Sequence, residues 1–122
     1  MSQKLIIVGA GQAAAQAVQS LRAEGFTGAI TLIGDEAYGP YQRPPLSKAY
    51  LQGTFERERL LLKSDAFYRE TDCALMLNTS VTALHRAEKT VELADGRKLP
   101  YDLLLLTTGA RVRRLTCPGA DL

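Results

Sequence analysis

One short glycine-rich segment, set between two contrasting hydrophobic patterns, most constrains how this chain can fold. Residues 5–8 form an apolar, β-branched run that stops at Gly9, which is typical of a buried parallel strand. Residues 11–24 carry apolar side chains at helical spacing instead. A second β-branched run follows at residues 30–33. The sequence therefore predicts a strand–helix–strand unit over about residues 4–34.

The segment between the first strand and the helix is Gly9-Ala10-Gly11-Gln12-Ala13-Ala14, a GxGxxA form of the dinucleotide-binding fingerprint. In such a motif the first glycine permits a tight turn, the second lets the backbone approach a pyrophosphate, and the small third residue allows close helix–strand packing. The helix N-terminus adds unpaired N–H groups for the phosphates. We therefore predict a dinucleotide site that includes Gly9, Gly11, Gln12, Ala13 and Ala14. The alternative is a tight turn without a ligand.

Two acidic residues follow the second predicted strand. Asp35 stands 21 residues after Ala14, close to the spacing at which the fingerprint expects an acidic residue. A carboxylate there accepts hydrogen bonds from ribose hydroxyls and repels a 2′-phosphate, so NADP is disfavoured at this site. Glu36 is adjacent, which leaves open that Asp35 only caps a turn. We favour Asp35 as the ribose ligand and keep Glu36 as a second candidate.

Two further segments carry candidate binding residues. Residues 41–48 contain two prolines and two cations, Arg43 and Lys48. Lys48 falls at the predicted start of a short helix, where a cation is unfavourable by about 0.3 kcal/mol unless an anion is beside it. A solvated loop is the alternative. Thr108 and Gly109 follow a buried run at residues 103–107, where a glycine permits close approach of a cofactor or simply ends a strand.

The rest of the pattern predicts a helix and five more strands. The helix spans Asp65–Glu70 and buries Phe67. A third buried strand spans residues 74–77, and the run at 103–107 is a fourth. Between these two strands the hydrophobic period changes to two, and Asp95-Gly96 is a hairpin signal. Three short antiparallel strands are therefore expected at about 80–85, 90–93 and 97–100. We expect His85, at the edge of this meander, to be a surface residue.

Composition excludes several classes of protein. The 122 residues suit one domain, and the net charge of +2 does not favour nucleic acid or an anionic membrane as a partner. The longest apolar runs are far shorter than the roughly 20 residues of a membrane span. The first residues lack the layout of a signal peptide, so we expect a cytoplasmic protein. Cys73 and Cys117 have no metal-ligand spacing, and we expect neither a disulfide nor a metal site.

Together these motifs resemble the N-terminal part of the FAD-dependent ferredoxin reductases that serve bacterial oxygenase systems. These are flavoproteins with two dinucleotide-binding domains. The likeness covers essentially the whole chain, and departs from the family pattern at Thr107 and Val112. The matching segments are residues 8–14, 33–36, 40–50, 95–102 and 107–111. The resemblance implies that FAD contacts Ala13, Asp35, Lys48 and the main chain of Val81, with Arg43 beside the phosphates and Thr108 and Gly109 closing over the cofactor.

The resemblance also implies an α/β fold with a Rossmann-like parallel sheet, in which a three-stranded antiparallel meander forms the crossover connection between the last two parallel strands. Residues 1–110 would form part of a discontinuous FAD-binding domain, and residues 111–122 a linker toward an NAD(P)-binding domain. The parent protein would pass electrons from NAD(P)H through FAD to an iron–sulfur (2Fe–2S) ferredoxin, and the isolated chain would lack turnover. Alternatives are a dinucleotide-binding module without turnover and a flavoprotein of the apoptosis-inducing-factor type. A disulfide reductase is disfavoured because residues 35–63 contain no cysteine.

Overall fold

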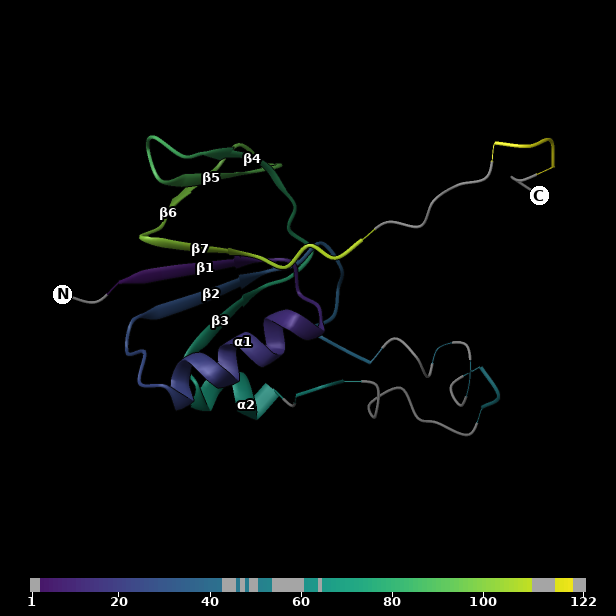
Figure 1. The fold of residues 1–122 in the computed structure, drawn as a ribbon, viewed down its shortest axis with the longest axis horizontal. Helices are drawn as coiled ribbons and strands as arrows, with labels where there is room; N and C mark the ends of the chain where they lie inside the picture. The colour runs from purple at the N-terminus through teal and green to yellow at the C-terminus, as the bar shows by residue number, and fades with distance from the viewer. Residues whose placement is uncertain are drawn as a thin grey trace.

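A parallel sheet of four strands forms the middle layer of the molecule (Figure 1). In this computed structural model, which describes residues 3–42, 46, 48, 51–53, 61–63, 65–110 and 116–119, the strands lie in the order β3-β2-β1-β7. Their bounds are Lys4–Val8 for β1, Ala29–Ile33 for β2, Cys73–Met76 for β3 and Leu103–Leu106 for β7. All neighbouring pairs are parallel, so the carboxyl ends of the four strands meet at one edge.

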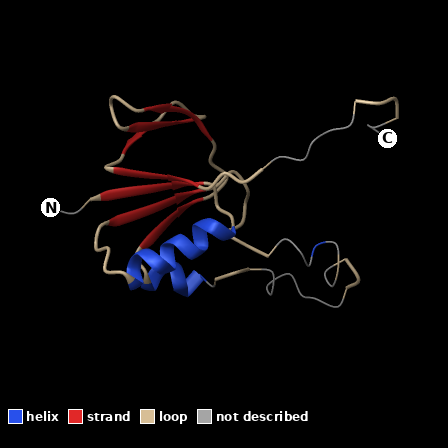
Figure 2. Ribbon diagram, in the orientation of Figure 1, coloured by secondary structure: helices blue, strands red, loops and turns tan. Residues whose placement is uncertain are grey.

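Different structures cover the two faces of this sheet (Figure 2). Helices α1 (Gln12–Ala23) and α2 (Asp65–Glu70) lie against one face. The other face is covered by an antiparallel meander of three strands, β4 (Val81–His85), β5 (Thr90–Leu93) and β6 (Lys98–Pro100). The meander follows β3 and precedes β7 in the chain, so it forms the crossover between these two strands. The predicted fold class is confirmed.

Alternate residues of the parallel strands fill two separate cores. Leu5 and Ile7 of β1 face the helices and pack in the same core as Val18 of α1. Ile6, which lies between them, faces the meander and packs in the same core as Val91 of β5. Because both faces are buried, a strand of this sheet needs apolar residues at successive positions. This explains why the run at residues 5–8 shows no alternation of polar and apolar side chains.

The helices predicted at 11–24 and 65–70 and all seven predicted strands are present, with small shifts at their ends, whereas the short helix predicted to begin at Lys48 includes residues outside the described part of the chain. The third strand begins at Cys73, one residue before the predicted start. Strands β4 and β6 each begin one residue later than predicted, and β5 has the predicted bounds. The hairpin signal at Asp95-Gly96 is also confirmed, since Gly96 adopts a φ of +92° between β5 and β6. The backbone N–H of Arg97 donates to Asp95 Oδ1 at 3.0 Å. This hydrogen bond holds the pKa of the Asp95 carboxyl below its ordinary value.

Strand β7 is only partly buried, which corrects the prediction of a buried run at residues 103–107. Leu103 is 41% exposed and Leu106 is 53% exposed. Within the described residues, β7 pairs only with β1 and forms one edge of the sheet. Leu104 and Leu105, in contrast, pack against the meander core and the helix core. An edge strand made of four leucines exposes apolar surface of the kind that edge strands in soluble proteins usually avoid.

One prediction about a single side chain also needs correction. Phe67 is only half-buried, and the neighbouring Tyr68 is the buried aromatic residue of α2, at 5% exposure. The six-residue helix presents Tyr68 to the sheet, while Phe67 contacts Tyr68 edge-on, with 5.2 Å between ring centroids. His85 is partly exposed at the surface, as predicted, and its Nε2 also lies 3.0 Å from Glu92 Oε1 across the β4–β5 pair, with both side chains 34% exposed.

The side chain of Arg22 donates hydrogen bonds to two loops at the amino-terminal end of the sheet. Its Nε donates to Thr71 O (2.7 Å), and its Nη1 donates to both Phe26 O and Gly28 O (2.8 Å each). These carbonyls belong to the turn after α2 and to the loop that leads into β2. The guanidinium also lies 5.7 Å from the centroid of the Phe26 ring. One planar group therefore satisfies backbone acceptors from two loops that are far apart in the sequence.

The two cysteines lie in different surroundings, since Cys73 is buried and Cys117 is exposed. Cys73 and Cys117 are both free. Cys73 starts β3 inside the helix core, and burial raises the pKa of its thiol from 9.0 to about 11, so it remains a neutral apolar group at physiological pH. Within the part of the chain that the structure describes, no helix combines the length and the apolar character that crossing a membrane requires.

We predict that Arg22→Met lowers the free energy of unfolding by about 2–3 kcal/mol, because several carbonyls lose a charged hydrogen-bond donor at once. Urea denaturation measures this change. Arg86→Met is the matched control, since Arg86 is an exposed arginine in the turn between β4 and β5. An equal loss of stability in the two variants would show that the carbonyl contacts of Arg22 contribute nothing specific.

Candidate dinucleotide-binding site

The first glycine of the fingerprint lies where β1 ends and the chain turns sharply into α1. Gly9 has a φ of +108°, and its N–H donates to Ile33 O at 2.8 Å. A Cβ at this position would collide with the carbonyl oxygen of Thr107 and would lie 2.9 Å from the Cα of Thr108. Both the dihedral angle and the space therefore require glycine here. The turn passes directly between the ends of β2 and β7.

The turn also packs closely against the residue that follows β2. A Cβ at Gly34 would lie 2.6 Å from the Cβ of Ala10. Beneath the turn, Ala14 is fully buried in the helix core. Small residues at these positions bring α1 against the carboxyl ends of the strands, as the fingerprint predicts.

The first turn of α1 presents backbone N–H groups that have no capping partner. The first hydrogen bond of the helix is donated by Ala15 N to the carbonyl oxygen of Gly11, the N-cap residue, at 3.2 Å. No side chain caps the helix, and none of the acidic residues lies in its first turn. The N–H groups of Gln12 and Ala13 precede the first intrahelical bond and both residues are exposed. Together with the helix dipole, these donors make a candidate anion site.

Gly11 is different from Gly9, because nothing requires a glycine at this position for folding. Its backbone is extended, with a φ of −107°. A Cβ built on Gly11 meets no atom within 4 Å. The space beside the second glycine of the fingerprint is therefore open, which is the condition for close approach of a ligand to the backbone.

Two cavities adjoin the turn at the carboxyl edge of the sheet. One, of about 250 Å³, lies over the turn between the fingerprint residues, the end of β2 and residues 107–109. The other, of about 740 Å³, extends from the ends of β1 and β2 to Thr79, Ser80 and Val81 at the start of the meander. Gly9, Asp35, Glu36, Thr108 and Gly109 line both. Because the two cavities share these residues, they form one extended candidate site.

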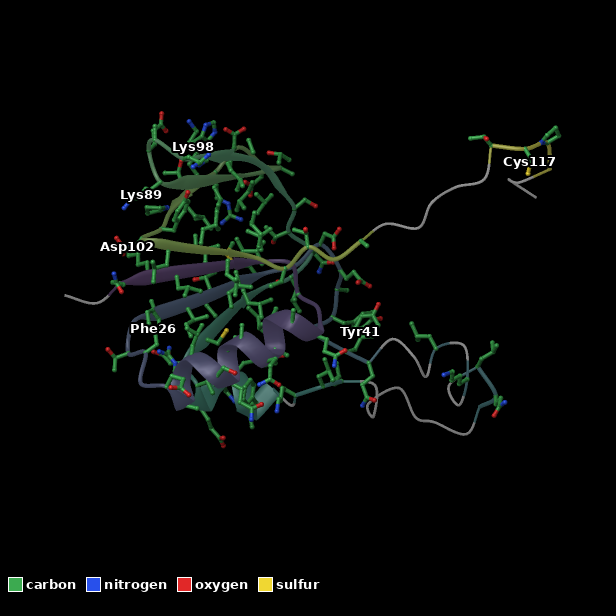
Figure 3. All side chains as sticks on the ribbon, in the orientation of Figure 1. Phe26, Tyr41, Lys89, Lys98, Asp102 and Cys117 are labelled. Atoms are coloured by element: carbon green, nitrogen blue, oxygen red, sulfur yellow. The ribbon has the colours of Figure 1, made fainter. Side chains whose placement is uncertain are left out.

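The two acidic candidates differ in their hydrogen bonds. Tyr41 donates from its hydroxyl to Glu36 Oε2 at 2.9 Å. Figure 3 shows Tyr41 near the end of the sheet at which the strands finish, with Phe26 and Asp102 at the opposite end. Among the described residues, no hydrogen bond to the carboxylate of Asp35 is recorded, and this residue is exposed. Both acidic residues are exposed and line both cavities, and only the carboxylate of Glu36 is engaged by Tyr41.

The structure brings most of the sequence-predicted residues together. Those that line the cavities are Gly9, Gly11, Gln12, Ala13, Asp35, Glu36, Val81, Thr108 and Gly109. Ala14 lies under the turn and supports it without lining a cavity. Lys48 is exposed and lines neither cavity, and Gln52 N donates to Lys48 O (3.0 Å), as expected for one helical turn. Arg43 lies outside the described residues, as do residues 111–115 and 120–122 of the predicted linker.

Some residues of the site were not predicted from the sequence. Thr79 and Ser80 line the larger cavity, and Thr107 lines the smaller one. The signal for Thr79 and Ser80 was present, because they follow the third parallel strand and so had to lie at the same edge as Gly9 and Asp35. Within the described residues there is no group of three His, Cys, Asp or Glu side chains able to hold a metal ion.

The fold is that of a Rossmann-like FAD-binding domain, with the meander packed on the second face of the sheet. The chain belongs to the pyridine nucleotide-disulphide oxidoreductase family, whose model matches residues 3–122. It is 46% identical over 121 residues to the probable ferredoxin reductase CtmF of Castellaniella defragrans, and 47% identical over 118 residues to rhodocoxin reductase of Rhodococcus erythropolis. These matches cover 99% and 97% of this chain.

A solved structure gives the same result in three dimensions. The covalent complex of putidaredoxin reductase with putidaredoxin contains a chain that superimposes with a TM-score of 0.89 at 43% identity. That match covers 93% of this chain and 27% of the solved one. The chain likewise spans only 30% of CtmF and 28% of rhodocoxin reductase.

We predict that replacing the two fingerprint glycines by alanine affects different properties, stability for Gly9 and ligand binding for Gly11. Gly11→Ala should leave the free energy of unfolding nearly unchanged, because its new methyl group enters open space, but should weaken binding of a dinucleotide. Gly9→Ala should destabilise the fold by at least about 1–2 kcal/mol, because it strains the backbone and forces Thr107 aside. Thermal unfolding without ligand, followed by ligand titration, separates the two effects. A Gly11→Ala variant that binds normally would contradict the assignment of this space to a ligand.

Proposed function

We propose that this chain forms the FAD-binding part of an NAD(P)H-dependent ferredoxin reductase. The observation that carries the proposal is the extended site, which runs from the open helix N-terminus past Asp35 to Val81 on the meander. The relatives give it a chemical identity, because CtmF is described as a probable ferredoxin reductase and rhodocoxin reductase is named for its electron acceptor. The family also matches the whole described part of the chain.

In this proposal each part of the site binds a different part of FAD. The N–H groups of Gln12 and Ala13 bind the pyrophosphate, where the helix dipole favours negative charge. The carboxylate of Asp35 accepts hydrogen bonds from ribose hydroxyls. The main chain of Val81 faces the adenine. Thr108 and Gly109 lie over the cofactor from the end of β7.

Two cations complete the proposed site by resemblance. Lys48 would lie near the flavin ring, and Arg43 beside the phosphates. Lys48 stands at the start of a helical turn, where a positive charge gains from an anion beside it. When bound, FAD supplies the redox chemistry, which is the uptake of hydride from NAD(P)H and the release of single electrons to a 2Fe–2S ferredoxin. This chain's own residues hold and orient the cofactor.

We further propose that residues 1–110 belong to a discontinuous domain and that residues 111–122 lead toward an NAD(P)-binding domain. The chain contains one dinucleotide fingerprint, and hydride transfer requires FAD and NAD(P)H to be bound together. The relatives named above are more than three times as long as the part they share with this chain, which spans 30% and 28% of them. The exposed leucines 103 and 106 on the edge strand β7 provide apolar surface for further chain to cover.

We predict that the full-length protein containing this chain purifies with bound FAD. The fingerprint, the ribose carboxylate and the meander together suit an adenine dinucleotide of the flavin type. The visible absorption spectrum of the protein, purified under native conditions, should show the two flavin bands. Chromatography of the cofactor released on denaturation then distinguishes FAD from FMN. Bound NAD with no flavin bands would overturn the proposal.

We predict that Asp35→Ala weakens FAD binding far more than Glu36→Ala. Removal of a charged acceptor from the ribose hydroxyls should cost about 1.5–3 kcal/mol, or roughly 10- to 150-fold in Kd. Glu36→Ala is the matched control, since Glu36 is adjacent and already accepts a hydrogen bond from Tyr41. Titration of the apoprotein with FAD, followed by flavin fluorescence, measures both. A larger effect at Glu36 would reassign the acidic position.

A further inference from the structure

The end of β7 is joined to the glycine-rich turn by a side chain as well as by its backbone. The backbone N–H of Thr107 donates to Val8 O at 2.9 Å, which continues the β1–β7 pairing. The hydroxyl of Thr107 then donates to Gly9 O at 2.7 Å and lies 3.3 Å from Val8 O. Thr107 is half-buried and lines the smaller of the two cavities.

This hydroxyl makes the hydrogen bond that holds the peptide between Gly9 and Ala10. The peptide before Gly9 is fixed, because Gly9 N donates to Ile33 O at 2.8 Å. The peptide after Gly9 has no such backbone hydrogen bond among the described residues, and its orientation depends on the dihedral angles of a glycine, the residue with the widest conformational freedom. Ala10 packs against Gly34, and the hydrogen bond from Thr107 to Gly9 O adds a directional contact that favours one orientation of the carbonyl.

The orientation of this peptide bears directly on ligand binding. In a trans peptide the C=O of Gly9 and the N–H of Ala10 point in opposite directions. A carbonyl held against β7 therefore directs the N–H of Ala10 away from β7. It also keeps the negative end of the Gly9 carbonyl engaged with a donor, at a turn where the site must accept an anion.

We propose that Thr107 is a positioning residue for the dinucleotide. Its hydroxyl preorganises the peptide between Gly9 and Ala10 before the phosphates bind. Without the hydroxyl, the free protein samples other orientations of this peptide. The apparent association constant for the dinucleotide is then reduced in proportion to the fraction of molecules that hold the binding-competent orientation. The inference rests on the proposed function, because it requires a dinucleotide at this turn.

Three variants of the full-length protein test the inference. Thr107→Val removes the hydroxyl and keeps the shape of the side chain. Thr107→Ser keeps the hydroxyl and removes the methyl group. Thr71→Val is the matched control, because Thr71 also donates from its hydroxyl to a backbone carbonyl at 2.7 Å, that of Phe67, but lies at the end of α2 and lines neither cavity. If Thr107→Val does not fold, Thr107→Ala takes its place.

The readouts are the Kd for FAD, from fluorescence titration of the apoprotein, and the thermal stability of that apoprotein. We expect Thr107→Val to raise the Kd about three- to tenfold, as for the loss of one hydrogen bond, and Thr107→Ser to stay within about twofold of the wild type. Thr71→Val should lower the stability of the apoprotein and leave the Kd unchanged.

Each other outcome is decisive. A Thr107→Val protein that binds FAD as tightly as the wild type overturns the role of Thr107 and leaves the proposed function intact. A Thr107→Ser protein that binds as weakly as Thr107→Val shows that the methyl group, and not the hydroxyl, matters, and overturns it too. If Thr71→Val raises the Kd for FAD as much as Thr107→Val does, the loss of affinity reflects general stability, and the role of Thr107 is overturned. A wild-type protein that binds no FAD overturns the proposed function and this inference with it.

Discussion

The close passage of Gly9 between the ends of β2 and β7 is the constraint on which the rest of the structure depends. The N–H of Gly9 bonds to the end of β2, and its carbonyl accepts from Thr107 at the end of β7. A side chain at this position would collide with the backbone of β7. Because the turn is held from both sides, α1 starts at a fixed place above the strand ends. The open N–H groups, the position of Asp35 and both cavities all follow from that placement.

Most of the fold could be predicted from the sequence because its signals are local. Buried parallel strands need successive apolar residues, so the run at residues 5–8 predicted β1 without knowledge of its neighbours. The change to a period of two predicted the meander, and Asp95-Gly96 predicted its second turn. The part of the candidate site that lies on the strand–helix–strand unit was predictable in the same way, whereas the predicted Lys48 lines neither cavity. The fingerprint fixes a backbone conformation, and the end of the next strand fixes the position of Asp35.

What the sequence could not predict depends on contacts between distant segments. The four leucines of β7 look equally buried in sequence, yet Leu103 and Leu106 are exposed because the described residues place no strand beyond β7. The choice between Phe67 and Tyr68 depends on the angle at which a six-residue helix meets the sheet. The difference between Asp35 and Glu36 depends on Tyr41. The role of Thr107 depends on a partner 98 residues away.

The two ends of the parallel sheet use their backbone polar groups in opposite ways. At the amino-terminal end, Arg22 donates to the carbonyls of Thr71, Phe26 and Gly28, so these groups are satisfied within the protein. At the carboxyl end, the first N–H groups of α1 have no cap. Unpaired donors weaken a fold, and a fold tolerates them where a ligand or water completes them. The donors at the start of α1 are therefore the backbone groups that this end of the sheet leaves for a ligand or water. Around them the backbone is held by hydrogen bonds between the strand ends, such as Gly34 N to Met76 O and Thr107 N to Val8 O, so the open donors sit in a fixed frame.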